Sequence, residues 1–443
     1  MAYADAVGRI SVRKNPISEK KMLQTLINAF KVKDIRRKVW MMLLLLLVFR
    51  IGCYIPVPGL DRELFQSNFG DGGNDFLTLM SSITGGALAN GTLFALGIGP
   101  YINASIIMQL LCVGIPPLER LSKQGEEGQK KISQYTRYLT ILLAVIQSIG
   151  IIVNFAGDSG SIKTQLFFDQ TWLAGLFLTV VYTGGAVLVM WLGERITDYG
   201  VGNGQSMIIF VGIIATAGQA IVNKFAEIPS NLDAIWELVA FVLVCVVIFF
   251  AIVYVDLSER KVPVQYAKQI KGRKMYGGQS THIPIKVAMA GVIPIIFAMS
   301  IMTFPQTLGA LMGKQWNWIN SNSWLYIIIY FLLIIFFTYF YTAIQFNPIE
   351  IANNMKKNGG FVPGIRPGKP TSDFINRVLT RVTLAGAFFL GIIAVLPIIL
   401  GKYIGFSISI GGTSLLILVG VALETVRQIE SQMLMRHYKG FLE

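Results

Sequence analysis

Residues 39–55 read VWMMLLLLLVFRIGCYI, an apolar run that follows the basic stretch from Lys31 to Lys38. About 20 apolar residues are enough to cross a bilayer as a helix. Similar runs recur along the whole chain and predict ten membrane spans, at 39–55, 92–115, 136–155, 171–192, 205–222, 236–255, 287–311, 324–346, 382–401 and 411–426. The basic segment before the first run is long and no small-residue cleavage site follows it, so this run is expected to be a retained anchor. The sequence therefore predicts an all-α polytopic membrane protein.

Positive charge favours one side of these spans. Nearly all of the 38 Lys and Arg residues lie before the first run or in every second connection. Arg50 lies within the first run, and the remaining connections carry only Arg62, Lys163, Lys224, Lys314 and Lys402. Because Lys and Arg are enriched in cytoplasmic loops, both termini are predicted to be cytoplasmic. The net charge of +14 is then mostly an orientation signal and is poor evidence for nucleic-acid binding.

The spans divide into two sets of five, which sets the expected domain organisation. A cytoplasmic segment (1–38) precedes an N-terminal half (39–222) and a C-terminal half (223–427), and a cytoplasmic tail (428–443) follows. Because five is odd, the second half enters the membrane from the opposite side. Inverted repeats have this layout, with a transport path at their interface.

The first segment contains apolar residues at helical spacing, surrounded by basic residues. These apolar residues are Met22, Leu23, Leu26, Ile27 and Phe30. They predict an amphipathic helix that either lies on the cytoplasmic membrane surface or docks a small partner helix.

Residues 76–88, between the first two runs, are apolar but too short to cross a bilayer. One helical face carries Phe76, Leu79, Met80, Ile83 and Ala87, and Leu88 ends the segment. Irregular backbone at membrane depth is tolerated only where protein or an aqueous cavity surrounds it. We predict a short re-entrant helix on the outer side, hinged by Gly85 and Gly86. A loop helix packed outside the bundle is the alternative.

One helical stripe of the second run changes from apolar to polar. It contains Ile98, Ile102, Ser105 and Gln109, at spacings that place them on one face of a helix. A pore-lining face with a dry constriction and a wetter cytoplasmic vestibule would have this pattern. Ordinary helix packing explains the periodicity alone more simply.

Charged residues avoid the middle of the spans. Arg50, Glu194, Asp256 and Glu424 all lie toward the span ends. Such residues are expected to snorkel or to pair at the interface rather than to bind a coupling ion. A ten-span secondary transporter of a small solute is the leading alternative function, but no polar midplane site for it is visible.

Signatures of enzyme chemistry are missing from the sequence. The two histidines, His282 and His437, lack metal-binding spacing. The glycine-rich stretch at 200–204 lacks the preceding strand and the following Lys-Ser/Thr pair of a phosphate loop. We therefore predict no catalytic residues, no metal site and no cofactor.

Two cytoplasmic connections, 257–286 and 347–381, are too long to be simple turns. The first contains an alternating stretch around Val264 and then Lys271, Gly272, Arg273 and Lys274 at a predicted hairpin tip. The second carries Lys356, Lys357 and Arg366, and nearby Pro and Gly residues place Arg366 on a stiff turn. Both loops are expected to dock a large cytosolic partner, including one that presents RNA phosphates.

Five motifs resemble those of the SecY family, the central channel subunits of bacterial protein translocons. They are LFALGIGPYI (93–102), KISQYTRY (131–138), QSTHIPIK (279–286), FVPGIRPG (361–368) and GGTSLLI (411–417). The resemblance covers almost the whole chain after about Lys33. It implies a channel in the bacterial plasma membrane that translocates unfolded preproteins and releases transmembrane segments laterally into lipid. A paralogous accessory channel for a few substrates is the alternative within the family.

The resemblance also implies site residues, position by position. Segment 76–88 would be a plug, below which a ring of aliphatic side chains would comprise Ile98, Ile102, Ile209, Ile296 and Ile417. A sixth position, commonly isoleucine in the family, matches Gln205, which puts a fully apolar ring in doubt. A lateral gate would lie between spans two and three on one side and seven and eight on the other, with Gln109 and Gln147 as polar residues.

The partners implied by the resemblance are SecE, which clamps the two halves, SecG, the SecA motor ATPase and the translating ribosome. Signal peptides and membrane lipids would meet at the lateral gate. The motor and the ribosome would share the two basic loops, with Arg366 as the principal docking residue and Lys271, Arg273 and Lys274 as secondary contacts.

Overall fold

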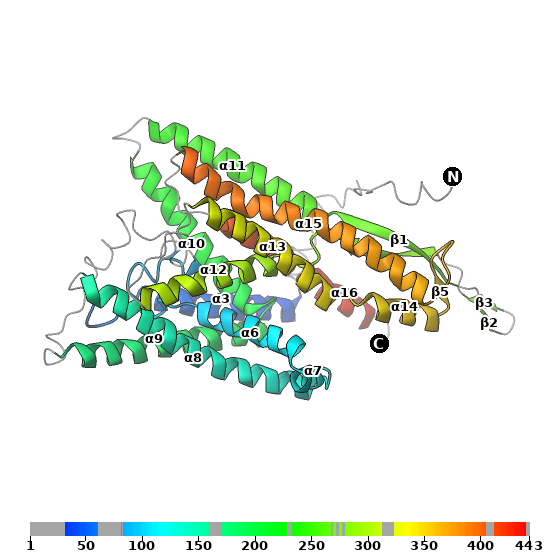
Figure 1. The fold of residues 1–443 in the computed structure, drawn as a ribbon, viewed down its shortest axis with the longest axis horizontal. Coiled ribbons are helices and arrows are strands. Elements are labelled where there is room, and N and C mark those ends of the chain that lie inside the picture. The colour runs from blue at the N-terminus through cyan, green and yellow to red at the C-terminus, as the bar shows by residue number, and fades with distance from the viewer. Residues whose placement is uncertain are drawn as a thin grey trace.

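The computed structural model describes residues 32–60, 81, 83–158, 170–227, 233–266, 269–271, 274–276, 280–311, 323–404 and 412–439. Helices dominate the fold, and most extend along the longest axis of the molecule (Figure 1). The N-terminal half contains α3 (Lys33–Gly52), α6 (Gly99–Gly114), α7 (Pro116–Ser122), α8 (Glu126–Asp158), α9 (Thr171–Tyr199) and α10 (Gly204–Glu227). The C-terminal half contains α11 (Asp233–Asp256), α12 (Ile293–Leu311), α13 (Trp324–Gln345), α14 (Pro348–Lys357), α15 (Lys369–Ile404) and α16 (Gly412–Lys439). The predicted N-terminal amphipathic helix lies outside the described residues.

Each of the ten predicted spans overlaps one of these helices. By length and composition, five of the described helices can cross a membrane, and α6 taken together with α7 makes a sixth. The α6–α7 pair bends by 107°. At the bend, Ile115 has an extended backbone (φ −112°, ψ 110°), which is the conformation that a following proline imposes. The described helices thus support a multi-pass protein, and the number of crossings stays a prediction.

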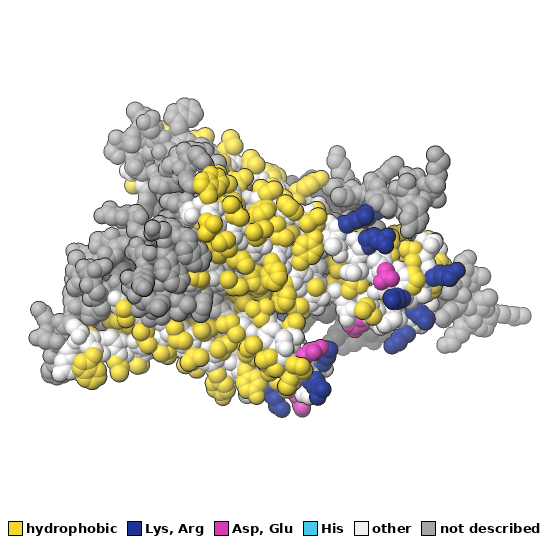
Figure 2. Space-filling model, in the orientation of Figure 1, with side chains coloured by type: hydrophobic (Ala, Val, Ile, Leu, Met, Phe, Trp, Pro, Cys, Tyr) yellow, Lys and Arg dark blue, Asp and Glu magenta, His cyan; other side chains and the backbone are white. Residues whose placement is uncertain are grey.

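On the face shown in Figure 2, hydrophobic side chains cover the middle of the molecule, and charged side chains gather near one end. On α11, for example, Leu243, Val247 and Phe250 are exposed. Large exposed apolar surfaces mark contact with a membrane or a partner. The charged end holds α7, α14 and strand β1, which belong to the connections predicted to be cytoplasmic (Figure 1).

The predicted start of the second span, at residue 92, is wrong, because α6 begins only at Gly99. Gly91 and Gly97 have positive φ angles of 57° and 53°, which a continuing right-handed helix does not allow. Pro100 then occupies the first turn of α6, where a missing N–H costs no hydrogen bond. Ile98 therefore precedes the helix as its N-cap residue.

Residues 84–98 are irregular yet mostly buried. Side chains of the segment form hydrogen bonds with some of its backbone polar groups. The Thr92 hydroxyl donates to the Ala87 carbonyl (3.0 Å) and the Asn90 side-chain amide donates to the Gly86 carbonyl (2.8 Å). The Thr84 hydroxyl accepts a hydrogen bond from the Leu88 N–H (3.3 Å). This segment therefore meets the condition under which irregular backbone is tolerated at membrane depth.

Glycines let three helices press directly on this segment. A Cβ at Gly212 of α10 would lie 2.4 Å from the Ile83 carbonyl oxygen, and one at Gly185 of α9 would lie 2.0 Å from that of Leu93. A Cβ at Gly52 of α3 would lie 2.0 Å from the Phe94 ring. The helices can approach this closely only because these positions lack side chains.

We expect Gly212→Ala to lower the thermal unfolding midpoint of the purified protein. The added methyl group would force the backbone at Ile83 to move, and overpacking of this kind costs about 1–3 kcal/mol. Gly218→Ala is the matched control on the same helix, because nothing lies within 4 Å of its Cβ position. The control should be neutral or slightly stabilising. Equal midpoints for the two variants would contradict the close contact.

The two long connections that are predicted to be cytoplasmic share one small sheet. Strand β1 (Glu259–Tyr266) pairs antiparallel with β4 (Ser280–Lys286) on one side and with β5 (Gly360–Phe361) on the other. At the tip, β2 (Gln269–Lys271) pairs with β3 (Lys274–Tyr276), which confirms the predicted hairpin. A separate hydrophobic core supports the sheet and consists of Val262, Val264, Ile285, Met355, Val362, Ile375 and Leu379.

Candidate functional site

A single hydrophobic cluster joins the two halves of the protein. It includes Ile98, Ile209 and Ile417 as buried members, and the half-buried Ile102 and Ile296 pack against it. These side chains come from the start of α6, from α10, α12 and α16. The structure thus brings all five isoleucines of the predicted ring into one cluster, with contributions from both halves.

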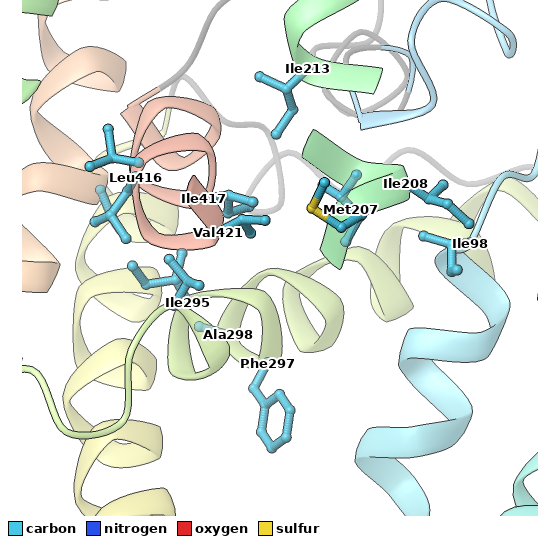
Figure 3. Close-up of a cluster of buried hydrophobic side chains, with 14 of the residues drawn as sticks. Ile98, Met207, Ile208, Ile213, Ile295, Phe297, Ala298, Leu416, Ile417 and Val421 are labelled. Carbon is cyan, nitrogen blue, oxygen red and sulfur yellow. The ribbon is translucent and has the colours of Figure 1, made fainter. Parts of the chain in front are cut away.

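The close-up of this cluster shows how the halves meet (Figure 3). Ile417 and Val421 of α16 face Met207 of α10, while Ile295 of α12 lies next to α16. Ile98 and Ile208 lie together on the opposite side of Met207. The Thr425 hydroxyl, one turn beyond Val421, donates to the Met207 sulfur at 3.5 Å. The contact between halves is therefore apolar at its centre, with a weak polar contact at its edge.

Gln205 lies at the beginning of α10, one turn before Ile209, and is half-buried. The Cγ of Gln205 and the Cδ1 of Ile98 are both 3.4 Å from the Cβ position of Gly193 on α9. The Gln205 and Ile98 side chains therefore both pack against α9 at Gly193. Asn203 caps this end of the helix, because its Oδ1 accepts the Gln205 N–H at 3.0 Å.

The described part of the predicted plug is its C-terminal end. Phe76, Leu79 and Met80 lie outside the described residues. Ser81 and Ile83 are helical, and the chain then turns. The predicted hinge residues Gly85 and Gly86 have φ angles of +69° and +83°, a backbone conformation that favours glycine. Leu88, which ends the segment, is buried.

The predicted lateral gate lies where α12 contacts both α6 and α8. Helix α13 also packs against α12, so the four helices that match spans two, three, seven and eight are neighbours. Gln109 is exposed, and its amide donates to the Ser105 hydroxyl at 3.3 Å. Gln147 of α8 is half-buried. The seam between the halves is closed by direct helix contact.

Arg366 is exposed on a turn that the backbone fixes. Gly364 and Gly368 have φ angles of +80° and +102° on either side of it. Its carbonyl oxygen accepts a hydrogen bond from the Thr371 hydroxyl at 2.8 Å. Its side chain is therefore presented to solvent from an ordered support.

The other predicted docking residues lie at the same end of the molecule. Lys356 and Lys357 are exposed in the last turn of α14. Lys271 and Lys274 pair across the β2–β3 hairpin, while Arg273 lies outside the described residues. Because β5 pairs with β1, the two loops form one platform rather than two independent probes.

Ion pairs join neighbouring helices near the ends of the predicted spans. Arg427 of α16 pairs with Asp256 at the end of α11, and Arg137 of α8 pairs with Glu194 of α9 at 2.8 Å. These pairs confirm that charged residues at the span ends find partners. Burial lowers the pKa of Lys286 on β4, and the nearby Arg427 lowers it further. Arg427, on the helix that carries Ile417, thus pairs with the residue that immediately precedes the first loop.

Comparison with known proteins decides the family. The family model for SecY matches residues 92–426 of the chain. The chain belongs to the SecY family. Its relatives in that family include the protein translocase subunit SecY of Streptomyces galbus, 44% identical over 441 residues, which covers 95% of this chain and 100% of the relative. The protein of the same name from Mycobacterium bovis is 43% identical over 455 residues, with the same coverage.

Solved structures share the SecY fold. One is described as a protein-conducting channel and has a TM-score of 0.66 at 19% identity, covering 92% of this chain and 97% of the other. Another is Sec61 in a canine ribosome–channel complex from the endoplasmic reticulum, with a TM-score of 0.62 at 18% identity and the same coverage. The predicted helical membrane fold and the family resemblance are therefore confirmed.

Sequence reasoning missed two features of the SecY-family site. The pairing of Gln265 with Phe361, which unites the loops, involves a strand of only two residues. Arg50 was expected to snorkel or pair at the interface, but its guanidinium donates to the carbonyl oxygen of Gly85. A charged residue inside an apolar run was the available signal for the second feature.

Proposed function

We propose that this chain is the channel subunit of a protein translocase that passes unfolded preproteins across the bacterial plasma membrane. The observation that carries the proposal is the isoleucine cluster between α6, α10, α12 and α16. Isoleucine side chains offer no directional hydrogen bonds, so they do not favour one peptide sequence over another. A narrow apolar constriction also resists wetting and opposes ion flow. Relatives over the full length are named protein translocase subunits, and a small-solute transporter is not supported.

The plug and the lateral gate belong to the same proposal. Segment 76–88 covers the ring from the outer side in the resting state, and it leaves by bending at Gly85 and Gly86. One solved structure with a similar fold (TM-score 0.64, 19% identity) carries the description that the plug domain of SecY stabilises the closed state of its channel. Separation of α12 from α6 and α8, next to Gln109 and Gln147, would let a segment of about 20 apolar residues enter lipid as a helix.

The cytoplasmic platform docks the partners that supply chains and energy. Arg366, Lys356 and Lys357 on one loop and Lys271, Arg273 and Lys274 on the other provide cations for the SecA motor and for ribosomal RNA phosphates. The ribosome-bound Sec61 neighbour supports ribosome docking. SecE clamps the two halves and SecG is the third subunit, with both termini of this chain cytoplasmic.

Crosslinking along the translocation path tests this function. A photo-crosslinking residue at Ile296 should capture a secretory precursor stalled during translocation. The same residue at Leu243, exposed on the outside of α11, is the matched control and should capture little precursor. Equal capture at both positions, or none at Ile296 while translocation proceeds, would contradict a path through the cluster.

A further inference from the structure

Arg50 is a cation inside the first apolar helix, two residues before α3 ends at Gly52. Its Nη1 donates to the Gly85 carbonyl at 3.2 Å, and its Nη2 donates to the Tyr54 hydroxyl at 3.1 Å. The guanidinium carbon also lies 5.2 Å from the centre of the Tyr54 ring. Ionisable side chains in membrane segments are costly, and they usually mark a functional contact.

Gly85 is held between two helices at the predicted hinge. A Cβ at this position would lie 2.5 Å from Nη1 of Arg50 and 3.0 Å from the Cα of Gly212 on α10. The neighbouring Thr84 carbonyl accepts a weak contact from the Cys53 thiol at 3.9 Å. The end of α3 therefore contacts two successive carbonyl groups of the hinge.

A short hydrogen-bonded turn transmits this hold to the helical end of the segment. The Ser81 carbonyl accepts both the Gly86 N–H at 2.8 Å and the Thr84 hydroxyl at 3.1 Å. Ser81 is only 8% exposed. Fixing Gly85 in place therefore also fixes Ser81, where the described helical part of the segment begins.

We propose that Arg50 is a positioning residue that latches the hinge of the plug in the closed channel, an inference that rests on the proposed role of segment 76–88. Hydrogen bonds from a guanidinium are of the strong, charge-assisted class, and a low-dielectric surround strengthens them. The latch is also releasable. Tyr54 is 64% exposed and belongs to the same segment as Arg50, not to the plug. When the plug moves and Gly85 with it, the guanidinium therefore keeps its contact with the Tyr54 ring and can be hydrated.

The test measures how well the closed protein protects a thiol at the hinge. Ser81→Cys is introduced into the full chain with Cys112→Ser and Cys245→Ser, while the buried Cys53 is kept because it contacts the hinge. Labelling by a membrane-impermeant maleimide is followed in membrane vesicles with the outer face accessible, and labelling of the same protein without Ser81→Cys is subtracted.

We expect Arg50→Met to raise the labelling rate roughly tenfold, since it keeps an unbranched stem in the side chain but removes a charge-assisted hydrogen bond. Arg50→Lys keeps the charge and should give a smaller rise in the labelling rate. A graded response of this kind distinguishes loss of the hydrogen bond from general misfolding of the variant. Arg195→Met is the matched control, because Arg195 contacts Trp191 and Tyr199 on its own helix. An unchanged rate in Arg50→Met, or an equal rise in Arg195→Met, would overturn the latch.

Resting ion conductance of the same variants separates this inference from the proposed function. A rise in both labelling and conductance for Arg50→Met supports the latch and the sealing role of the plug together. A rise in labelling without any rise in conductance supports the latch but shows that the segment does not seal the channel.

Discussion

Ile296→Gly is expected to raise the resting ion conductance of the channel in planar bilayers about tenfold, a shift of about 1.4 kcal/mol between closed and open states. Truncating an aliphatic side chain in a packed cluster costs about 2–5 kcal/mol. Only the part of that cost that is absent from the open state shifts the equilibrium between the closed and open channel. Ile296 is half-buried against the cluster, so its loss both weakens the seal and widens a constriction that excludes water.

The neighbouring residue provides the control for this experiment. Ile295 is fully buried in the same cluster but does not match a ring position. Ile295→Gly places the same glycine in the same helix, so the intrinsic cost to the helix is equal. We expect Ile295→Gly to lower the thermal unfolding midpoint more than Ile296→Gly, and to change the conductance less. The opposite order of conductances would remove Ile296 from the ring.

Arg366→Glu is expected to reduce translocation of a secretory precursor by roughly 10- to 100-fold, the range for loss of a dominant interface residue. The side chain is exposed on a fixed turn, so it is presented to a partner without a large ordering cost. Charge reversal then replaces attraction to phosphates or carboxylates with repulsion. The protein should still insert into the membrane and bind the proposed clamp subunit SecE, because Arg366 contributes to neither the cores nor the spans.

Lys369→Glu is the matched control for Arg366→Glu. Lys369 is also exposed, lies three residues further along the same loop, and gives the same change in net charge. If both variants translocate equally well or equally badly, the general charge of the loop decides docking and Arg366 has no particular role. A docking contact with phosphates also predicts that higher salt narrows the difference between wild type and Arg366→Glu.

The sequence predicts the helices well because membrane spans depend on composition over long windows. Boundaries are less predictable, as the second span shows. The run from residue 92 is apolar up to Gly97, apart from Thr92, but Gly97 takes a positive φ angle and the helix starts at Gly99. Whether a glycine inside an apolar run breaks the helix depends on what packs there. Here the break is compensated by burial of the irregular segment and by hydrogen bonds such as that from Thr92 to Ala87.

The candidate site is predicted by family position rather than by periodicity. Ile98 and Ile102 lie on an apolar stripe, but such stripes also occur in ordinary helix packing. Long-range backbone contacts were not predictable from either source. The carbonyl of Gly85, which Arg50 contacts, has no signature in the sequence, since every residue carries a carbonyl. The β1–β5 pairing joins residues almost one hundred positions apart through a strand of only two residues.

The most direct test of the account is protease protection of a radiolabelled secretory precursor. The precursor is added to liposomes that contain this chain, the proposed partners SecE and SecA, and ATP, and insertion of the chain is verified separately. We predict protection that requires every component, since the precursor must pass through the channel to be shielded. Absence of protection with a correctly inserted chain would contradict a protein-conducting channel.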